Sequence, residues 1–146
     1  MLRLVEIDRY NYLPVLELSV SEEQKKFVAT NQYSLAQAYA QPECVPFALY
    51  AENKPVGFAM YCLDADDHQY WIYRLMIDQR HQGKGYGREA MRLLIDRIRG
   101  FSDEEHRCIY ISFEPENTVA KSLYESLGFL PDGRIEYGEV VYRLEI

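Results

Sequence analysis

The chain has 146 residues, 48% of them hydrophobic and 27% charged, which is typical of a globular protein with a substantial core. We therefore expect residues 1–146 to form one domain. The formal net charge of −7 argues against nucleic acid as a partner, because a phosphate backbone needs a broad basic face, and it suits a cationic substrate better.

The first half of the chain predicts short helices among strands. Apolar and polar side chains alternate where a half-buried strand is expected, and capping residues indicate where helices begin. In chain order, these elements are a strand at 2–7, helices at 12–20, at 22–28 and from Ser34 to a stop at Pro42, and strands at 47–51, 56–63 and 70–77.

The second half alternates helices with strands. In Arg88–Arg99 the apolar residues fall on one face, and Gly100 ends the helix. The later elements are a strand at 108–113, a helix at 118–127 that Asn117 can cap and Gly128 ends, and a closing hairpin that starts at 129 and has its second strand at 140–146. This order predicts an α/β fold whose mixed sheet carries helices on its faces, not a regular array of parallel strand–helix units.

A glycine turn, Gln82-Gly83-Lys84-Gly85-Tyr86-Gly87, connects the strand at 70–77 to the helix that follows. Alternating glycines let the backbone turn tightly and approach a ligand, while a helix start presents free amides and a positive dipole end. Between Arg74 and Arg88, four basic residues face a single acid, Asp78. These features predict a site for a phosphate group, and the alternative is an ordinary turn before a solvated helix.

The same segment also matches the dinucleotide-binding pattern G-x-G-x-x-G/A, from Gly85 to Ala90. In that pattern the first glycine directly follows a strand and opens the first strand–helix–strand unit. Here residues 78–84 intervene, several strands come first, and the chain that remains is too short for a doubly wound sheet. The dinucleotide interpretation therefore ranks well behind.

The cysteines and histidines predict no metal site. Cys44, Cys62 and Cys108 contain no C-x-x-C pair, and the last two lie in apolar, strand-like runs, as buried free thiols do. The three histidines are scattered without ligand spacing. Because we find no signal peptide and no apolar run that could span a bilayer, we expect a cytoplasmic protein without a membrane partner.

Two motifs together resemble the GNAT superfamily of N-acetyltransferases. The first, Q/R-x-x-G-x-G/A, reads here from Gln82 to Gly87, and the second, an Asn before a helix that contains Ala and Tyr and closes on Gly-Phe, reads from Asn117 to Phe129. The resemblance covers the chain from about Tyr70 to Phe129. It implies the GNAT fold, with a central twisted mixed sheet of about six or seven mostly antiparallel strands and helices on both faces.

Within the superfamily, Tyr70–Asp78 and Phe27–Ser34 resemble the BltD/PaiA group, which acetylates spermine and spermidine. The resemblance implies acetyl-CoA as the donor and a polyamine as the acceptor, without a metal. A homodimer is an option that the family allows.

The resemblance also assigns coenzyme contacts. The residues that would bind acetyl-CoA are Leu75, Met76, Ile77, Gln82, Gly83, Lys84, Gly85, Tyr86, Gly87, Arg88, Asn117, Ala120 and Lys121. The turn amides would hold the pyrophosphate, and the preceding strand would present its backbone to the pantetheine arm and the acetyl carbonyl. The alternative is that the strand residues are core, that Lys84 and Arg88 are solvated, and that Asn117 only caps its helix.

Tyr124 is the catalytic acid that the second motif implies. When the tetrahedral intermediate collapses, the coenzyme leaves as a thiolate, which a nearby phenol can protonate; packing in an amphipathic helix is the alternative role. The amine must also lose a proton, since an alkylamine has a pKa of about 10.4. Either a carboxylate that acts through a water or bulk solvent alone could take this proton. The candidate substrate residues, each of which also fits a surface or core position, are the carboxylates Glu22, Glu23 and Glu114, and Tyr33 and Tyr73 as rings that stack against a cation.

The sequence thus predicts an acetyl-CoA-dependent N-acetyltransferase whose acceptor, a primary amine of a polyamine such as spermidine or spermine, attacks the thioester directly. No covalent acetyl-enzyme is expected, because no cysteine lies in the motif region. Two alternatives stay open. One is acetylation of another small amine, an aminoglycoside or a peptide N-terminus, and the other is an inactive, CoA-binding regulatory module.

Overall fold

The computed structural model describes residues 1–146. Its strands are β1 (Leu2–Val5), β2 (Cys44–Ala51), β3 (Lys54–Leu63), β4 (Tyr70–Ile77), β5 (Cys108–Phe113), β6 (Leu130–Glu136) and β7 (Glu139–Glu145). Its α-helices are α1 (Tyr12–Glu17), α2 (Asn31–Ala40), α3 (Tyr86–Arg99) and α4 (Thr118–Ser126), and two 3-10 helices are η1 (Glu22–Gln24) and η2 (Gln79–His81). None of these helices has the length and apolarity that crossing a bilayer requires.

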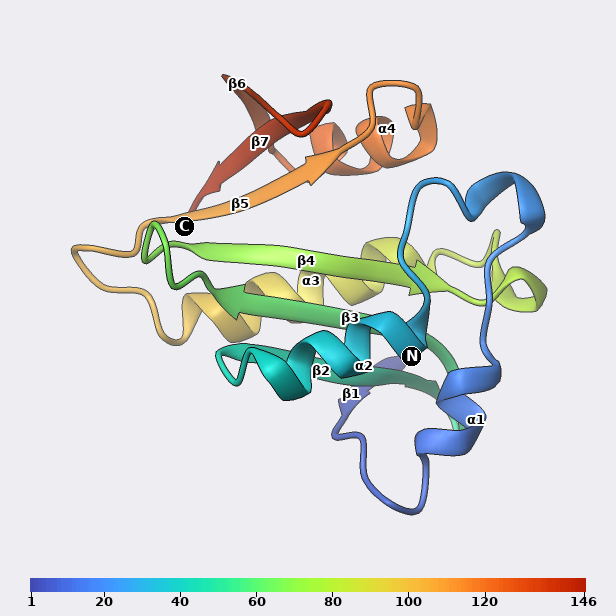
Figure 1. The fold of residues 1–146 in the computed structure, drawn as a ribbon. Coiled ribbons are helices and arrows are strands. Elements are labelled where there is room, and N and C mark those ends of the chain that lie inside the picture. The colour runs from blue at the N-terminus through green and yellow to red at the C-terminus, as the bar shows by residue number, and fades with distance from the viewer.

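All seven strands form one sheet, in the order β1-β2-β3-β4-β5-β7-β6 (Figure 1). Neighbouring strands are antiparallel except for β4 and β5, which are parallel. The last hairpin does not simply extend the sheet, because β7 pairs with β5 and leaves β6 at the edge. The predicted α/β fold with a mixed, mostly antiparallel sheet is confirmed.

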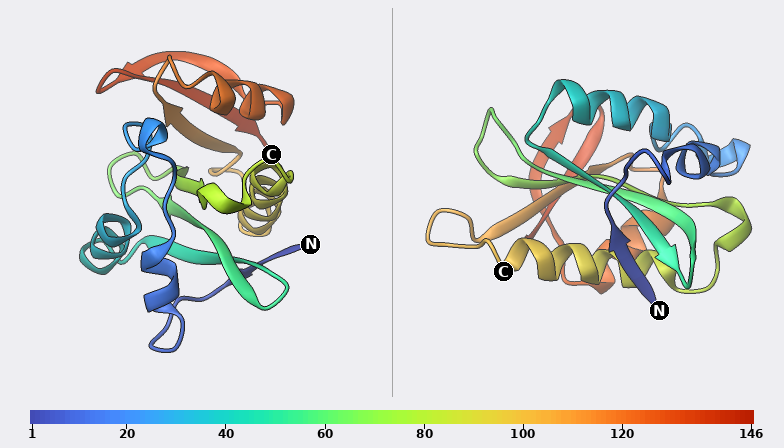
Figure 2. Two further views of the ribbon diagram at one scale, coloured as in Figure 1. Left: turned by 90° about the vertical axis from the view of Figure 1, so that its right-hand side faces the viewer. Right: turned by 90° about the horizontal axis from the view of Figure 1, so that it is seen from below.

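Helices cover both faces of the sheet (Figure 2). On one face, the apolar stripe of α3 buries Met91, Leu94 and Ile98, and α4 packs beside it. On the other face, α1 and α2 lie over a second, smaller apolar cluster. Alternate residues of β3 enter the two clusters, with Phe58 in the smaller and Ala59 in the larger. A central strand that is buried on both faces explains the nearly continuous apolar run in its sequence.

Two helix predictions are wrong. Residues 22–28 form η1 and a loop, because their charged run lacks the apolar stripe that would hold a helix on the sheet. α2 begins at Asn31, and its cap is Thr30, whose Oγ1 accepts from the Tyr33 amide at 3.1 Å. Ser34, the predicted cap, is buried within the helix, and its hydroxyl donates to the Thr30 carbonyl at 3.0 Å. The other elements are present, with ends shifted by three residues or fewer.

The sheet opens between β4 and β5. These strands pair only at Tyr70–Ile109 and Trp71–Tyr110, and they then separate toward their carboxyl ends (Figure 1). The register between β3 and β4 also shifts here, so that Tyr73 is an extra residue in β4. Such a bulge bends a strand and increases its twist. The separation creates the space in which the candidate site lies.

Candidate active site

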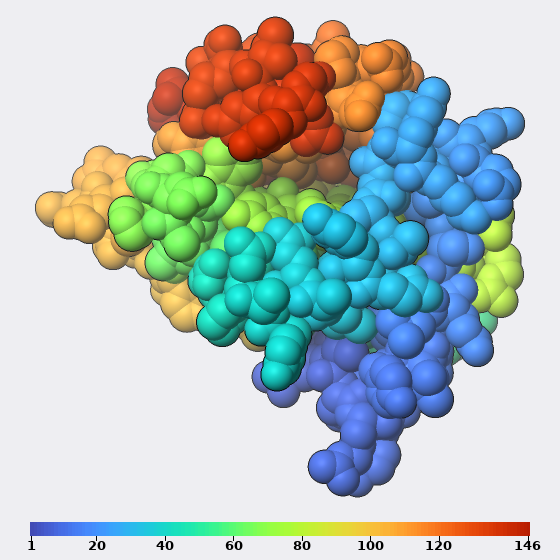
Figure 3. Space-filling view, viewed as in Figure 1, coloured from blue at the N-terminus to red at the C-terminus, as the bar shows by residue number.

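A cavity of about 1020 Å³ fills the gap between β4 and β5. Its wall includes Tyr73, which packs on the smaller apolar cluster, and Tyr124, which belongs to the larger one on the opposite face. The cavity therefore passes through the sheet. Figure 3 shows the surface hollowed between the red hairpin β6–β7 and the blue-to-cyan segment around α2. This volume suits a large ligand.

The glycine turn forms part of the cavity wall. Gly83 and Gly85 have φ angles of +81° and +82°, which side chains rarely adopt. The amides from Gly83 to Arg88 donate no hydrogen bond within the protein, and the first helical bond runs from the Glu89 amide to the Gly85 carbonyl at 3.1 Å. Together with the positive end of the α3 dipole, these amides suit a phosphate group.

Two side chains hold the turn in place. The Gln82 Nε2 donates to the Ile77 carbonyl at 2.9 Å, and its amide group pairs with that of Gln24 at 3.0 and 3.1 Å. Asp78, which is 1% exposed, accepts from the Ser19 amide at 3.0 Å and from the Arg80 Nε at 2.8 Å. The sequence predicts Gln82 as a coenzyme contact. In the structure, its side chain is bonded within the protein and positions the turn.

We expect Asp78→Asn to lower the free energy of unfolding by about 1–3 kcal/mol at pH 7. Burial raises the pKa of Asp78, but the bonds from Arg80 and Ser19 outweigh it and lower the pKa below its usual value. A carboxyl group with a lowered folded pKa stabilises the fold above its unfolded pKa of about 3.9, and it loses this contribution as the pH falls through the folded pKa. The deficit of the variant should therefore shrink between pH 7 and pH 3.

Urea unfolding at both pH values measures this deficit. Asp96→Asn is the control, because Asp96 is exposed on α3 and paired only with Arg99, so that little change is expected. A deficit for Asp78→Asn that is equal at both pH values would contradict the role of the carboxylate.

Tyr124 projects from α4 into the cavity wall. Its ring packs against Phe113 and Phe129, with centroids 5.4 and 6.0 Å away, and only 8% of the residue is exposed. Burial, with a smaller effect from the negative charge of Glu139, raises the pKa of Tyr124 to about 12. The phenol therefore keeps its proton at neutral pH. Packing and hydrogen-bond donation are compatible roles for this side chain.

Most of the predicted coenzyme residues meet at the cavity. Those on the wall are Leu75, Met76, Ile77, Gln82, Gly83, Gly85, Tyr86, Gly87, Asn117 and Ala120. Lys84, Arg88 and Lys121 lie off the wall: both lysines are exposed, and the Arg88 Nη2 donates to the Ser126 hydroxyl at 2.6 Å. Asn117 caps α4, since its Oδ1 accepts from the Ala120 amide at 3.2 Å.

The predicted acceptor residues divide into two groups. Tyr33 and Tyr73 lie on the wall, and the Tyr73 hydroxyl donates to Asp64 at 2.5 Å. Glu22, Glu23 and Glu114 lie outside it. The first two are exposed on η1, because residues 22–28 form no helix that would turn them inward, and Glu114 follows the end of β5. The structure therefore supplies none of the predicted carboxylates to the cavity.

Arg74 fixes the bulge of β4 to α2. Its Nη1 donates to the Tyr73 carbonyl at 2.9 Å, and its Nη2 donates to the Gln37 Oε1 at 2.8 Å. The guanidinium also lies over the Tyr33 ring, 5.7 Å from its centroid. Burial lowers the pKa of Arg74 below its usual value. These contacts place a cation on the side of the cavity that Tyr33 and Tyr73 line, which is called the acceptor side below because these two residues are predicted to contact the amine.

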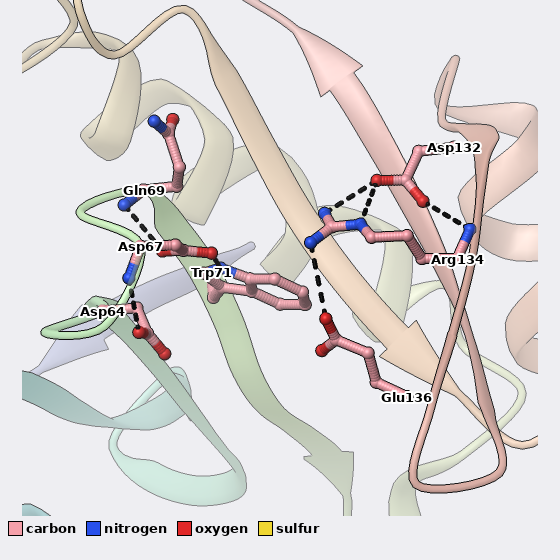
Figure 4. Close-up of polar contacts among 7 residues, drawn as sticks. All are labelled: Asp64, Asp67, Gln69, Trp71, Asp132, Arg134 and Glu136. Carbon is pink, nitrogen blue, oxygen red and sulfur yellow. Dashed lines mark hydrogen bonds and ion pairs between the residues drawn. The ribbon is translucent and has the colours of Figure 1, made fainter.

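The hairpin β6–β7 brings further polar residues that sequence reasoning missed. Glu136 and Glu139 both lie on the cavity wall. Arg134 bonds Asp132 at 2.8 Å and Glu136 at 3.4 Å, and its guanidinium lies 5.7 Å from the Trp71 ring centroid (Figure 4). The guanidinium thereby contacts the sheet at Trp71 and Tyr110, where β4 and β5 still pair. No residue spacing in the sequence could reveal Glu136 and Glu139, because they reach the cavity through the pairing of β5 with β7.

The comparisons with known proteins agree with this geometry. The model of the acetyltransferase (GNAT) family matches residues 12–129. Over 145 residues, the chain is 33% identical to a spermine/spermidine N(1)-acetyltransferase of Bacillus subtilis (strain 168), and the match covers 93% of each chain. A probable spermine N(1)-acetyltransferase of Bacillus subtilis subsp. natto (strain BEST195) is 32% identical with the same coverage.

A solved structure shares the fold. An aminoglycoside acetyltransferase in complex with coenzyme A aligns with a TM-score of 0.79 and 18% identity, over 99% of this chain and 95% of the other.

Proposed function

The chain belongs to the acetyltransferase (GNAT) family, and from this premise we propose that it transfers an acetyl group from acetyl-CoA to a primary amine of a polyamine, with spermidine and spermine as the first substrates to test. The observation that carries the proposal is one cavity that joins the free amides of the glycine turn to Tyr124. The names of two relatives, each 32–33% identical, support the polyamine as acceptor.

The proposal treats residues 1–146 as one catalytic domain, since one sheet contains every strand. A cytoplasmic location is part of it, supported by three free cysteines, which a reducing compartment preserves. All proposed site residues come from one copy of the chain, so a homodimer would be an addition and not a requirement.

The coenzyme would lie along β4. Because β5 leaves β4 after Trp71, the backbone of Leu75–Ile77 has no strand partner on the cavity side. Unpaired N–H and C=O groups at a strand edge suit the amides of a pantetheine arm. The amides of Gly83–Arg88 would then hold the pyrophosphate at the start of α3.

Tyr124 would act where the thioester breaks. The neutral amine attacks the acetyl carbon, a C–N bond forms, and the C–S bond breaks with its electron pair on sulfur. The Tyr124 hydroxyl donates a hydrogen bond to this thiolate and supplies its proton, and the proton that the nitrogen loses as it becomes an amide restores the phenol. A backbone amide of β4 that points at the carbonyl oxygen stabilises the negative charge that develops there.

An amine panel tests the proposal. Spermidine, spermine, an aminoglycoside and a peptide with a free N-terminus are each incubated with acetyl-CoA, and the released thiol is measured. We expect kcat/KM for a polyamine to exceed that for the other amines by at least about tenfold, which corresponds to 1.4 kcal/mol. Turnover only on one of the other amines would contradict the polyamine as acceptor and would identify that amine as the substrate. Coenzyme binding without any turnover would instead favour a regulatory module.

A further inference from the structure

Glu139 is the carboxylate that β7 directs into the acceptor side of the cavity. It is the first residue of β7, after the turn at Tyr137-Gly138. Val140 and Tyr142 pack on the cluster beneath α3 and α4, so the alternation of a strand turns Glu139 toward the opposite face. Tyr73 contributes to the wall from that same face.

One oxygen of Glu139 is held, and the other is free for a ligand. The Ser112 hydroxyl donates to its Oε1 at 2.8 Å. Ser112 is itself fixed by the pairing of β5 with β7, where it lies opposite Val141. The ion pairs of the protein all involve other residues, so no lysine or arginine neutralises this carboxylate at close range.

Charged and titratable groups face Glu139 from four directions. Glu136 lies opposite it in the hairpin, Glu114 follows β5, Tyr124 comes from α4, and Arg74 comes from β4. The charge of Glu139 contributes to the raised pKa of Glu114 and of Tyr124. Arg74 is the one cation in this set, and it is already engaged with α2. A second cation, such as an alkylammonium, would therefore be attracted here.

We propose that Glu139 binds the ammonium group of the acceptor and accepts, directly or through one water, the proton that this group must lose. The inference rests on the proposed function and identifies the general base of the proposed reaction. The proton moves from nitrogen to the Glu139 carboxylate, and the freed lone pair forms the C–N bond to the acetyl carbon. The C–S bond then breaks with its electron pair on sulfur, which takes the proton that Tyr124 donates. The second proton, which the nitrogen loses as it becomes an amide, returns the Tyr124 phenolate to a phenol.

Proton transfer to Glu139 would also change Tyr124. While Glu139 is ionised, its negative charge helps to raise the pKa of the phenol. A protonated Glu139 no longer exerts this effect, so Tyr124 becomes a stronger acid once the amine has become a nucleophile.

Glu139→Gln tests the inference, because glutamine can still accept from Ser112 but carries no charge and takes no proton. We expect kcat/KM for the best amine of the panel to fall by about 10²–10⁴-fold at pH 7. Its logarithm should then rise with slope one toward the amine pKa of about 10.4, whereas the wild type levels off at lower pH. Glu145→Gln, at the exposed far end of β7, is the matched control and should behave as wild type.

Equal kcat/KM and an equal pH profile in Glu139→Gln would overturn the assignment. A wild type that acetylates no amine would refute the proposed function, and the ammonium site is then tested separately. Spermidine is titrated calorimetrically into the protein with CoA bound. An affinity that Glu139→Gln weakens by about tenfold or more supports the site, whereas equal affinity, or no binding to wild type, overturns it.

Discussion

Tyr124→Phe is expected to lower turnover by about 10²–10⁴-fold while the affinity for acetyl-CoA stays close to that of the wild type. The substitution removes only the hydroxyl, so the contacts of the ring with Phe113 and Phe129 can persist. In the proposed binding mode, the glycine turn and the edge of β4 hold the coenzyme, and the substitution changes neither. Thiol release at saturating substrates measures turnover, and calorimetry measures the affinity.

Tyr142→Phe provides the matched control for this loss. Tyr142 is also buried, and it also packs against Phe113, but its hydroxyl donates to Glu125 at 3.0 Å and it is absent from the cavity wall. We expect this variant to keep normal turnover. If Tyr124→Phe keeps it as well, the phenol is not the acid.

Gly85→Val should weaken acetyl-CoA binding by about ten- to hundredfold, because about 1–3 kcal/mol of backbone strain must be relieved by moving the turn. Gly85 has a φ of +82°, a conformation in which a β-branched residue is an outlier. An added Cβ meets no atom within 4 Å, so the effect would come from the backbone and from the space that a phosphate needs, not from a clash within the protein. Calorimetric titration measures the dissociation constant.

Gly133→Val separates general strain from loss of the phosphate site. Gly133 has a φ of +91° and equally open surroundings, but it lies in β6, away from the turn. This variant should lose comparable stability and keep its coenzyme affinity. Normal affinity in Gly85→Val would show that the turn does not bind the diphosphate.

The glycine turn and the capped helix α4, which form the proposed coenzyme side of the cavity, could be predicted from the sequence because their signals are local. Gly83 and Gly85 adopt the left-handed conformation that only glycine takes easily, and Asn117 caps the helix that follows it. Both features depend only on residues that are close in the sequence. The apolar runs of β4 and β5 indicate that the strands before the turn and before Asn117 are central in the sheet. Local sequence therefore predicts the turn and the capped helix α4 that carries Tyr124.

The acceptor half depends on contacts between distant segments. Strict alternation along β4 would point Tyr73 and Arg74 to opposite faces, but the bulge turns both toward α2. Glu139 reaches the cavity because β7, not β6, pairs with β5. Neither the bulge nor this strand order has a sequence signal, which is why the sequence indicates Glu22, Glu23 and Glu114 as carboxylates instead.

The brief pairing of β4 with β5 lets two ligands approach each other from opposite sides of one sheet. In the proposed direct transfer, both ligands are bound at the same time and the protein does not carry the acetyl group itself. Output would then depend on simultaneous occupancy, so that when both metabolites are scarce the rate falls with the product of their concentrations. Such an enzyme works fast only where the amine and activated acetate are abundant together.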